Sequence, residues 1–493
     1  MRTNALPILH SSFSNEQAFR TRQTDEYSLL PIRFLPLDAT RYAATNIVGE
    51  YKVLTREELY NLVNHQLPMD GTLYEDLKSK HFLIDGDSLV AVELVAAKLR
   101  TRYYQSSSLT SLFLFVVTLR CEHACPYCQV SRRSMDKAAF DMSEETAHKA
   151  IDLVFESPSH SIKVEFQGGE PLLNFARIRF IVQEVERRNV IAGKDIAFVI
   201  ATNLALIDDD ILTFCQAHSI DISTSLDGPA DLHNANRPRP GGDSYEKTIE
   251  GIKHVREVLG DSKLAALMTT TKASLGRERD IIDEYRRQGF NAIFLRSLSP
   301  YGFAVKTGAI SGYDIDAWLE FYKRGLRYIL DLNRSGEVFV EEYAAIMLRK
   351  MLTPYPQGFV DLQSPAGLGL AVLAINYDGY VYASDEARML AEMKDYTFRL
   401  GKVGEAGLAD LISSDAFIEM LESTMTEGMP LCSECGFQPY CGSDPVFHHA
   451  TQNDMVGNKG ASSFCKKNMQ IAKHLILLME DYPEDARVLR SWL

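Results

Sequence analysis

The sequence lacks the long apolar segments that mark membrane and secreted proteins. No stretch of its 493 residues approaches an uninterrupted apolar run of membrane-spanning length. Residues 1–20 contain neither the apolar core nor the cleavage site of a signal peptide. The formal net charge of −14 argues against a broad nucleic-acid-binding surface. We therefore expect a cytoplasmic protein without membrane or nucleic-acid partners.

Cysteine is absent from most of the chain, including the whole segment between Cys215 and Cys432. Seven of the eight cysteines fall into two clusters, and only Cys215 stands alone. Disulfides are rare in the cytosol, so clustered cysteines in such a chain favour metal ligation. The composition is otherwise that of an ordinary globular protein with roughly two to four domains, without repeats or low-complexity tracts.

The first cysteine cluster lies in residues 112–128, LFLFVVTLRCEHACPYC. The short run of branched and aromatic residues predicts a buried strand, and the cysteines then lie on the loop after it. Their spacing is C-x3-C-x2-C. A cubane iron–sulfur cluster takes four thiolates when fully ligated, so three cysteines leave one iron open. A zinc site is the alternative, although zinc motifs favour C-x2-C pairs with a fourth ligand nearby.

This spacing, with Tyr127 beside the last cysteine, resembles the signature of the radical S-adenosylmethionine (SAM) superfamily. In that family the amino and carboxylate groups of SAM chelate the open iron, and electron transfer cleaves SAM to a 5′-deoxyadenosyl radical. The resemblance implies that Cys121, Cys125 and Cys128 hold a SAM-binding [4Fe–4S] cluster and that Tyr127 contributes to the cofactor site.

From residue 112 to about residue 300, strand-like apolar runs alternate with amphipathic helical stretches. Repeated strand–helix units favour a parallel α/β sheet, open or closed into a barrel. The expected strands are 112–119, 162–167, 195–202, 221–226, 263–271 and 291–298. Six such units match the partial (β/α)6 TIM barrel of the radical SAM family, although periodicity alone does not exclude a doubly wound sheet.

The loop after the second expected strand reads QGGEP, residues 167–171. Two glycines allow close backbone approach, and a carboxylate can accept hydrogen bonds from an ammonium group. The stretch resembles the GGE motif of the family, which implies that Gly168, Gly169 and Glu170 bind the SAM amino group. A tight turn with an incidental acid is the alternative.

The fourth expected strand ends in SLDGP, residues 225–229, followed by His233 and Arg237. This stretch is similar to one in sulfatase-maturing and other peptide-modifying radical SAM enzymes. The similarity implies that Ser225 and Arg237 contact the SAM carboxylate, a role that suits a guanidinium group. The DGP sequence also predicts a β-turn, and His233 is expected to be structural.

The second cysteine cluster has the spacing C-x2-C-x5-C followed by a distant fourth cysteine. It resembles the SPASM domain, the C-terminal module of peptide-modifying radical SAM enzymes, which binds two auxiliary clusters. Ser384 and Asp444 stand where the first of these would have cysteines, so we expect one auxiliary [4Fe–4S] cluster. A structural zinc site remains the alternative. The four expected ligands are Cys432, Cys435, Cys441 and Cys465.

Three further stretches resemble one subfamily, the His-Xaa-Ser system radical SAM maturases (HxsB). They are TNIVGEY (45–51), SDEARML (384–390) and CGFQPYCGSDPVFHHATQNDMVGNK (435–459). The resemblance implies a ribosomally made peptide or protein as substrate, a second radical SAM protein (HxsC) as partner and a reducing electron donor. The alternatives are a sulfatase-maturing-type peptide oxidase and a non-catalytic precursor-binding scaffold.

The catalytic acid or base is not assigned, and Asp385, Asp444 and Tyr301 are candidates to accept a proton or hydrogen. The expected organisation begins with a small α+β domain, suited to precursor or partner recognition or to covering one end of the barrel, and ends with the SPASM-like domain. Its expected parts are a loose arm (1–30), the α+β domain (31–105), the radical SAM core (106–309), a helical bridge (310–360) and the auxiliary-cluster domain (361–493).

Iron content after anaerobic reconstitution tests the two expected clusters. Each cubane holds four irons, so the wild type should bind about eight and the Cys121/Cys125/Cys128→Ala variant about four. Iron and sulfide analysis measures both. A fall from about four to none, with zinc bound, would instead make the C-terminal cysteines a structural zinc site.

Overall fold

The computed structural model describes residues 27–86, 89–104 and 109–493. The chain divides into two compact units. The first takes the residues up to Tyr103 together with Pro354–Pro356 and Cys435–Pro439. The second contains Tyr104–Thr353, Gln357–Glu434 and Tyr440–Leu493. None of the helices in the described residues combines the length and hydropathy that crossing a membrane requires.

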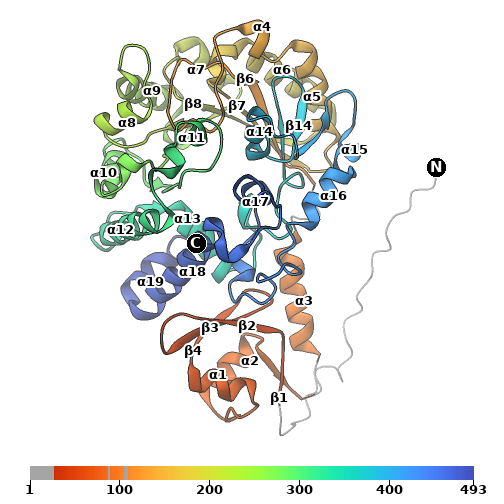
Figure 1. The fold of residues 1–493 in the computed structure, drawn as a ribbon, viewed down its shortest axis with the longest axis vertical. Helices are drawn as coiled ribbons and strands as arrows, with labels where there is room; N and C mark the ends of the chain where they lie inside the picture. The colour runs from red at the N-terminus through yellow and green to blue at the C-terminus, as the bar shows by residue number, and fades with distance from the viewer. Residues whose placement is uncertain (1–26, 87–88, 105–108) are drawn as a thin grey trace, which may run out of the picture. The chain divides into compact units, whose positions relative to one another are not determined.

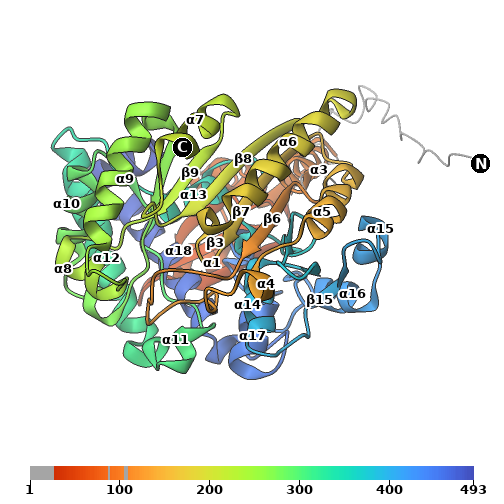
Figure 2. The ribbon, with the colours of Figure 1, turned by 90° about the horizontal axis from the view of Figure 1, so that it is seen from above.

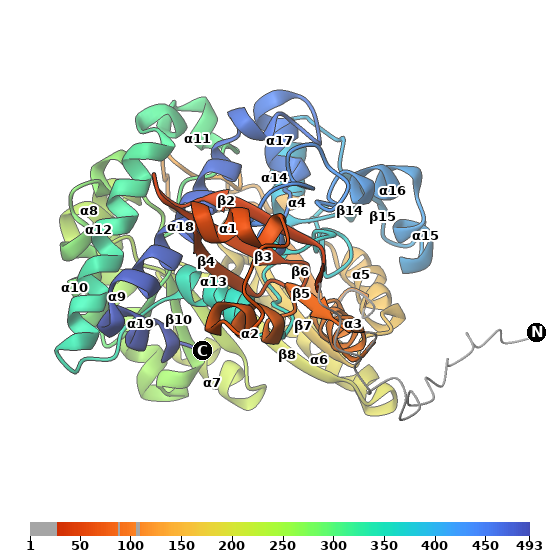
Figure 3. The same cartoon turned by 90° about the horizontal axis from the view of Figure 1, so that it is seen from below.

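The first unit contains a three-stranded antiparallel sheet, a short two-stranded pair and three helices (Figure 3). Thr55 and Glu58 form a capping box at the start of α1. Residues 1–30 are not simply a loose arm, because Tyr27–Leu29 forms strand β1 and pairs with β5; the rest of the arm lies outside the described residues. The other elements are β2 (Ile32–Pro36), β3 (Arg41–Asn46), β4 (Tyr51–Thr55), β5 (Leu83–Asp85), α1 (Arg56–Val63), α2 (Thr72–Ser79) and α3 (Val90–Arg102).

The second unit is built on an eight-stranded sheet of order β10-β9-β8-β7-β6-β13-β14-β15. Its five parallel strands β6 to β10 correspond to the first five expected strands and are joined by helices (Figure 1). The strands are β6 (Leu112–Thr118), β7 (Ser161–Gly168), β8 (Asp195–Thr202), β9 (Asp221–Ser225) and β10 (Leu264–Leu267). The helices between them are α4 (Lys137–Phe140), α5 (Glu144–Glu156), α6 (Phe175–Ala192), α7 (Asp209–Ala217), α8 (Ala230–Asn236) and α9 (Ser244–Leu259).

The two faces of this sheet differ, as the alternation of residues along β7 shows. Val164 and Phe166 are buried, and helices α5 and α6 run along one face of the sheet (Figure 2). The Phe166 ring stacks on that of Phe198, with ring centroids 6.4 Å apart, and packs at a tilt against that of Phe115, with ring centroids 6.2 Å apart. Because strand side chains alternate between faces, the side chain of Glu165, which lies between these two residues, is on the opposite, inner face. The apolar face therefore anchors the helices and leaves polar groups inside the barrel.

The sixth expected strand is much shorter than the sequence indicates. Only Ala292–Ile293 forms a strand, β11, and it pairs in parallel with β12 (Val340–Glu341) instead of β10. Beyond it, the Leu295 amide donates to the Glu341 carboxylate and the Leu298 amide donates to the Tyr313 hydroxyl. Side chains from distant segments thus accept the hydrogen bonds that a neighbouring strand would have accepted if the whole apolar run formed a strand.

Strands β13 (Val372–Ile375) and β14 (Tyr380–Tyr382) form a hairpin around the Asp378-Gly379 turn, with Gly379 at φ +84°. Its first strand pairs in parallel with β6, so the hairpin and β15 (Arg399–Lys402) extend the barrel sheet. The segment expected as a helical bridge includes β12 between two helices. The remaining helices are α10 (Glu278–Arg287), α11 (Phe303–Lys306), α12 (Ile315–Arg334), α13 (Glu342–Leu352), α14 (Asp385–Glu392), α15 (Leu408–Ile412), α16 (Asp415–Glu422), α17 (Pro445–Gln452), α18 (Ser463–Asp481) and α19 (Pro483–Arg490).

The phenylalanine stack on the helix-facing side of the sheet should carry a large share of the stability of the second unit. Phe166→Ala should lower the free energy of unfolding by about 3–5 kcal/mol, as deletion of a buried aromatic ring does. Both tryptophans, Trp318 and Trp492, belong to this unit, so tryptophan fluorescence in a denaturant titration reports on it alone. Val190→Ala, at a side chain that is 85% exposed, is the control and should change it by less than about 0.5 kcal/mol. Equal effects of the two substitutions would contradict this assignment.

Candidate functional site

The three cysteines of the first cluster lie on the loop that follows β6, as predicted. The thiol of Cys125 lies within electrostatic range of both Cys121 and Cys128. Burial raises the pKa of the Cys121 thiol and raises that of Cys125 to about 12. Buried thiols of this kind ionise when a bound metal supplies positive charge. The donor set therefore fits a thiolate-ligated metal centre.

The GGE loop packs directly on the backbone that leads into these cysteines. A Cβ atom at Gly169 would lie 2.2 Å from the Arg120 carbonyl oxygen, and one at Gly168 would lie 2.1 Å from the Thr118 carbonyl oxygen. The Gly169 amide donates to Thr118 O at 2.9 Å, and the Glu170 amide donates to Arg120 O at 2.8 Å. Only glycines permit this approach, which fixes the Glu170 backbone next to Cys121.

The Glu170 carboxyl group is buried and held by protein donors. Its Oε1 accepts from the Thr202 hydroxyl at 2.6 Å and the Leu172 amide at 3.0 Å, and its Oε2 accepts from the Asn203 amide at 2.9 Å. Burial, with a smaller contribution from the neighbouring Glu122, raises the pKa of Glu170 to about 8. A cationic group placed beside Glu170 would favour its charged form. The position thus suits the ammonium contact that the motif implies.

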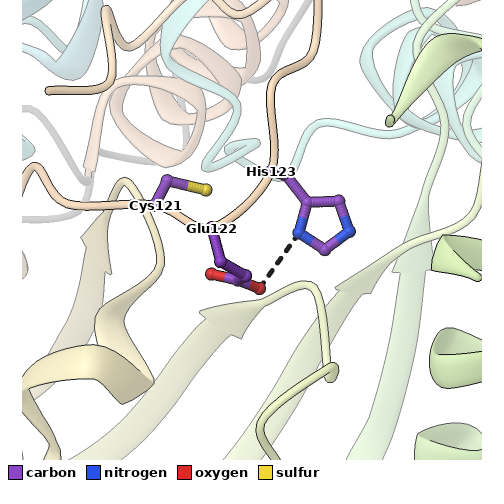
Figure 4. A group of neighbouring side chains, drawn as sticks. All are labelled: Cys121, Glu122 and His123. Carbon is purple, nitrogen blue, oxygen red and sulfur yellow. Dashed lines mark hydrogen bonds and ion pairs between the residues drawn. The ribbon is translucent and has the colours of Figure 1, made fainter. Parts of the chain in front are cut away.

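Glu122 and His123 belong to the same loop, and the sequence analysis did not single them out. With Cys121 they place a thiol, a carboxylate and an imidazole within 4.8 Å of one another (Figure 4). Glu122 Oε1 accepts from the Asn203 amide group at 2.8 Å and lies 3.0 Å from His123 Nδ1. Among the described residues, Glu122 Oε2 is buried without a hydrogen-bond partner. Their position between two ligand cysteines is the signal that could have identified them.

A buried carboxylate, Asp227, connects the cysteine loop with the loops after β9 and β10. Its Oδ2 accepts from the Tyr127 hydroxyl at 2.6 Å and from Arg237 Nε at 3.0 Å. Its Oδ1 accepts from Arg237 Nη2 at 3.1 Å and from the Thr269 amide at 3.2 Å. The Arg237 guanidinium also lies over the Tyr127 ring, 5.5 Å from its centroid. Tyr127 and Arg237 therefore meet as the sequence suggests, but they meet at Asp227, which the sequence analysis treated only as part of a turn.

Two further predicted positions lie at the same end of the barrel. Ser225 ends β9 and is opposite Leu267 of β10 in the parallel register. Gly302, at φ +60°, packs on the cysteine loop, because a Cβ atom there would lie 2.2 Å from the Gln129 carbonyl oxygen. The next amide, that of Phe303, donates to Cys128 O at 2.7 Å. The segment that contains Tyr301 is thereby fixed beside the cysteines.

The second unit contains a cavity of about 810 Å³ next to these loops. Its walls include Leu114 and Glu165 from the inner sheet face, Leu298 and Tyr301 from the segment after β11, and the first turns of α12, α14, α17 and α18. Leu298 also packs on Tyr127. The cavity therefore shares a wall with the cysteine site, where a substrate of that site could bind.

The second cysteine cluster is divided between the two units. In the second unit, the buried Lys459 ammonium lies within electrostatic range of Cys432, Cys441 and Cys465. A cation beside three thiols favours their thiolate forms. Cys435 belongs to the first unit, where the adjacent Gly436 carbonyl accepts from the Thr45 hydroxyl at 2.7 Å.

Comparison with known proteins agrees with this site. Residues 115–295, which run from within β6 to beyond β11, match the model of the Radical SAM superfamily. This segment is a radical SAM domain. The match covers Cys121, Cys125 and Cys128, the GGE loop and Asp227. The predicted α/β fold of the radical SAM core is thereby confirmed.

Similar proteins extend beyond this segment. An uncharacterized protein of Methanothermobacter thermautotrophicus is 27% identical over 232 residues, 46% of this chain and 82% of that protein. The cysteine-type anaerobic sulfatase-maturating enzyme of Clostridium novyi is 23% identical over 383 residues, 73% of this chain and 95% of the enzyme. The solved structure of native anSMEcpe with bound AdoMet and Cp18Cys peptide has a TM-score of 0.60 and 17% identity, covering 77% of this chain and 99% of that one. The chain thus shares the fold of a protein whose structure holds AdoMet and a peptide.

The Tyr127–Asp227 hydrogen bond should stabilise the cysteine loop. Tyr127→Phe leaves the buried Asp227 with one donor fewer, so it should cost about 1–3 kcal/mol of stability and speed the loss of iron to a chelator. Tryptophan fluorescence and chelator absorbance measure the two effects. Tyr60→Phe, at a side chain that is 59% exposed, is the control. Identical iron-release rates in the two variants would show that the bond does not hold the loop.

Proposed function

We propose that this protein is a radical SAM enzyme that reductively cleaves SAM and uses the resulting radical to modify a ribosomally made peptide or protein. The observation that carries the proposal is the packing of a three-cysteine loop on the GGE loop, with both anchored beside a cavity. The bound AdoMet and peptide of the anSMEcpe structure, which shares the fold, support it.

In this proposal Cys121, Cys125 and Cys128 ligate the [4Fe–4S] cluster. When bound, the cluster and SAM supply a 5′-deoxyadenosyl radical that abstracts a hydrogen atom from the substrate. The chain itself binds and orients. Glu170 accepts from the SAM ammonium, and Gly168 and Gly169 bring it close to the cysteine loop.

Arg237 and Ser225 are proposed to contact the SAM carboxylate. Asp227 already pairs with two nitrogen atoms of Arg237, so its role is to set the orientation of the guanidinium. Tyr127 lies beneath that guanidinium and orients it from the other side. The surrounding barrel excludes water from the site, which protects a radical from side reactions.

Other parts of the proposal rest on the sequence resemblance. They are a His-Xaa-Ser substrate, the partner HxsC, precursor recognition by the first unit, and one auxiliary [4Fe–4S] cluster on Cys432, Cys435, Cys441 and Cys465. A fully ligated auxiliary cluster would relay electrons or brace the fold, because it has no open iron for substrate.

A second candidate is a sulfatase-maturing-type oxidase. The similarity to the Clostridium novyi enzyme over 95% of its length favours it. Mass spectrometry of a cysteine-containing sulfatase peptide, incubated with the reduced protein and SAM, distinguishes the two. Modification of that peptide would support the oxidase.

SAM cleavage tests the proposed function. The reconstituted protein with SAM and dithionite should release 5′-deoxyadenosine, detected by liquid chromatography and mass spectrometry, and Cys125→Ala should release none because its cluster loses a ligand. Cys215→Ala is the matched control, since this buried cysteine lies outside both clusters. If the iron-loaded wild type releases none, the protein is a scaffold rather than an enzyme.

A further inference from the structure

The cavity beside the cysteine site lies wholly in the second unit and has a volume of about 810 Å³, within the range of ligand pockets, roughly 300–1,000 Å³. On one side, Tyr301 leads through Gly302 to the backbone of Cys128. On another, Lys467 lies within electrostatic range of Cys441. The cavity is therefore in contact with segments that carry cysteines of both clusters.

Carboxyl groups outnumber cationic groups in its lining. Seven of them line the cavity, against two cations, Arg296 and Lys467. Local partners account for some of the negative charge. Asp385 pairs with Arg388 at 2.5 Å, and Asp444 accepts from a backbone amide as the N-cap of α17. A surplus of negative charge remains after these are set aside.

Glu165, Asp361 and Glu386 make up the core of this surplus. Burial raises the pKa of all three carboxyl groups, that of Glu386 to about 7. Asp361 and Asp385 contribute to this rise in the pKa of Glu386, whereas Arg296, with Nη2 3.9 Å from Glu386 Oε1, opposes it. The lining thus contains too few cationic groups to balance the negative charge that its carboxyl groups would carry when ionised.

Lys467 does not remove the surplus. Its ammonium group lies over the rings of Tyr343 and Phe464, at 5.5 and 5.4 Å from their centroids. Asp361 and Asp444 lie within its electrostatic range. The single charge of this lysine, held at the aromatic wall, offsets at most one of these two acids, while Glu165 and Glu386 line the cavity from other elements.

Two buried donors in the same lining have no hydrogen-bond partner among the described residues. They are the Tyr301 hydroxyl and the Trp318 indole N–H, in side chains that are 1% and 2% exposed. Asp444 and Glu386 act electrostatically on Tyr301, which places its hydroxyl near the cavity acids. Unpaired buried donors are costly, so a ligand with acceptor oxygens would relieve them. A peptide carbonyl provides such an oxygen.

We propose that the cavity binds a cationic side chain, an ammonium or guanidinium group, of the peptide substrate. Glu386 and Asp361 contact the charge, and Tyr301 and Trp318 donate to acceptor oxygens of the peptide. The proposal rests on the proposed function, because it assigns the substrate class of the same site. It makes charge, rather than size alone, the basis of recognition.

Calorimetric titration of the SAM-loaded holoprotein with three capped tripeptides tests this. The peptides are acetyl-Gly-X-Gly-amide with X as lysine, norleucine or glutamate, so that lysine and norleucine differ mainly in charge. Lysine should bind about tenfold more tightly than norleucine, the factor that one charge-assisted hydrogen bond supplies, and glutamate most weakly. Glu386→Gln and Asp361→Asn should each reduce this preference severalfold. Glu257→Gln, at a side chain that is 60% exposed, is the control and should leave it unchanged.

Equal binding of lysine and norleucine, tighter binding of glutamate, no binding of the lysine peptide at 10 mM (about the weak limit of such contacts), or a preference that survives both variants would overturn the inference. The wild-type comparison alone decides if a variant fails to fold. Release of 5′-deoxyadenosine by the same samples separates the two proposals. Cleavage of SAM without a lysine preference refutes only the inference, and a preference without cleavage refutes only the proposed function.

Discussion

The buried carboxylate of Asp227 is the group on which the geometry of the candidate site depends. It joins the cysteine loop, through Tyr127, to the loops after β9 and β10, through Arg237 and the Thr269 amide. A charge in such a place is tolerated only when it is paired and hydrogen-bonded. The buried carboxylate is therefore stable only when all its hydrogen-bond donors are in place. This requirement holds three separate loops together at the end of the barrel.

Much of the core could be predicted because its strands are short, apolar and regularly spaced. The sequence also identified the three-cysteine loop and the GGE loop, whose glycines are required by backbone contact. The predicted length of β11 was wrong, because the apolar pattern does not reveal that the side chains of Glu341 and Tyr313 accept hydrogen bonds from backbone amides beyond it. The anchoring role of Asp227 and the position of Glu122 depend on contacts between distant loops, which spacing along the chain does not encode.

The barrel contains an acidic cavity in addition to the cysteine thiols. The inner sheet face presents Glu165 where the outer face presents Phe166, so one strand supplies both the core and the pocket. Five helices, α12, α13, α14, α17 and α18, present their N-terminal turns to the pocket. Acids such as Asp444 are favoured at these turns by the helix dipole. Part of the acidity of the pocket thus follows from how the helices are directed toward it, and Glu165 adds a carboxyl group from the sheet.

The pairing of β6 with β13 also constrains the time at which the site can form. The strand that precedes the cysteines takes its second neighbour, through Phe113 and Leu373, from a segment made much later on the ribosome. At synthesis rates of about 5–20 residues per second, this delay is on the order of 10–50 s. During that time the cysteine loop follows a strand, β6, whose edge toward β13 is still unpaired. If these cysteines ligate the proposed cluster, its assembly is best timed after translation is nearly complete, when the strand before them has both its neighbours.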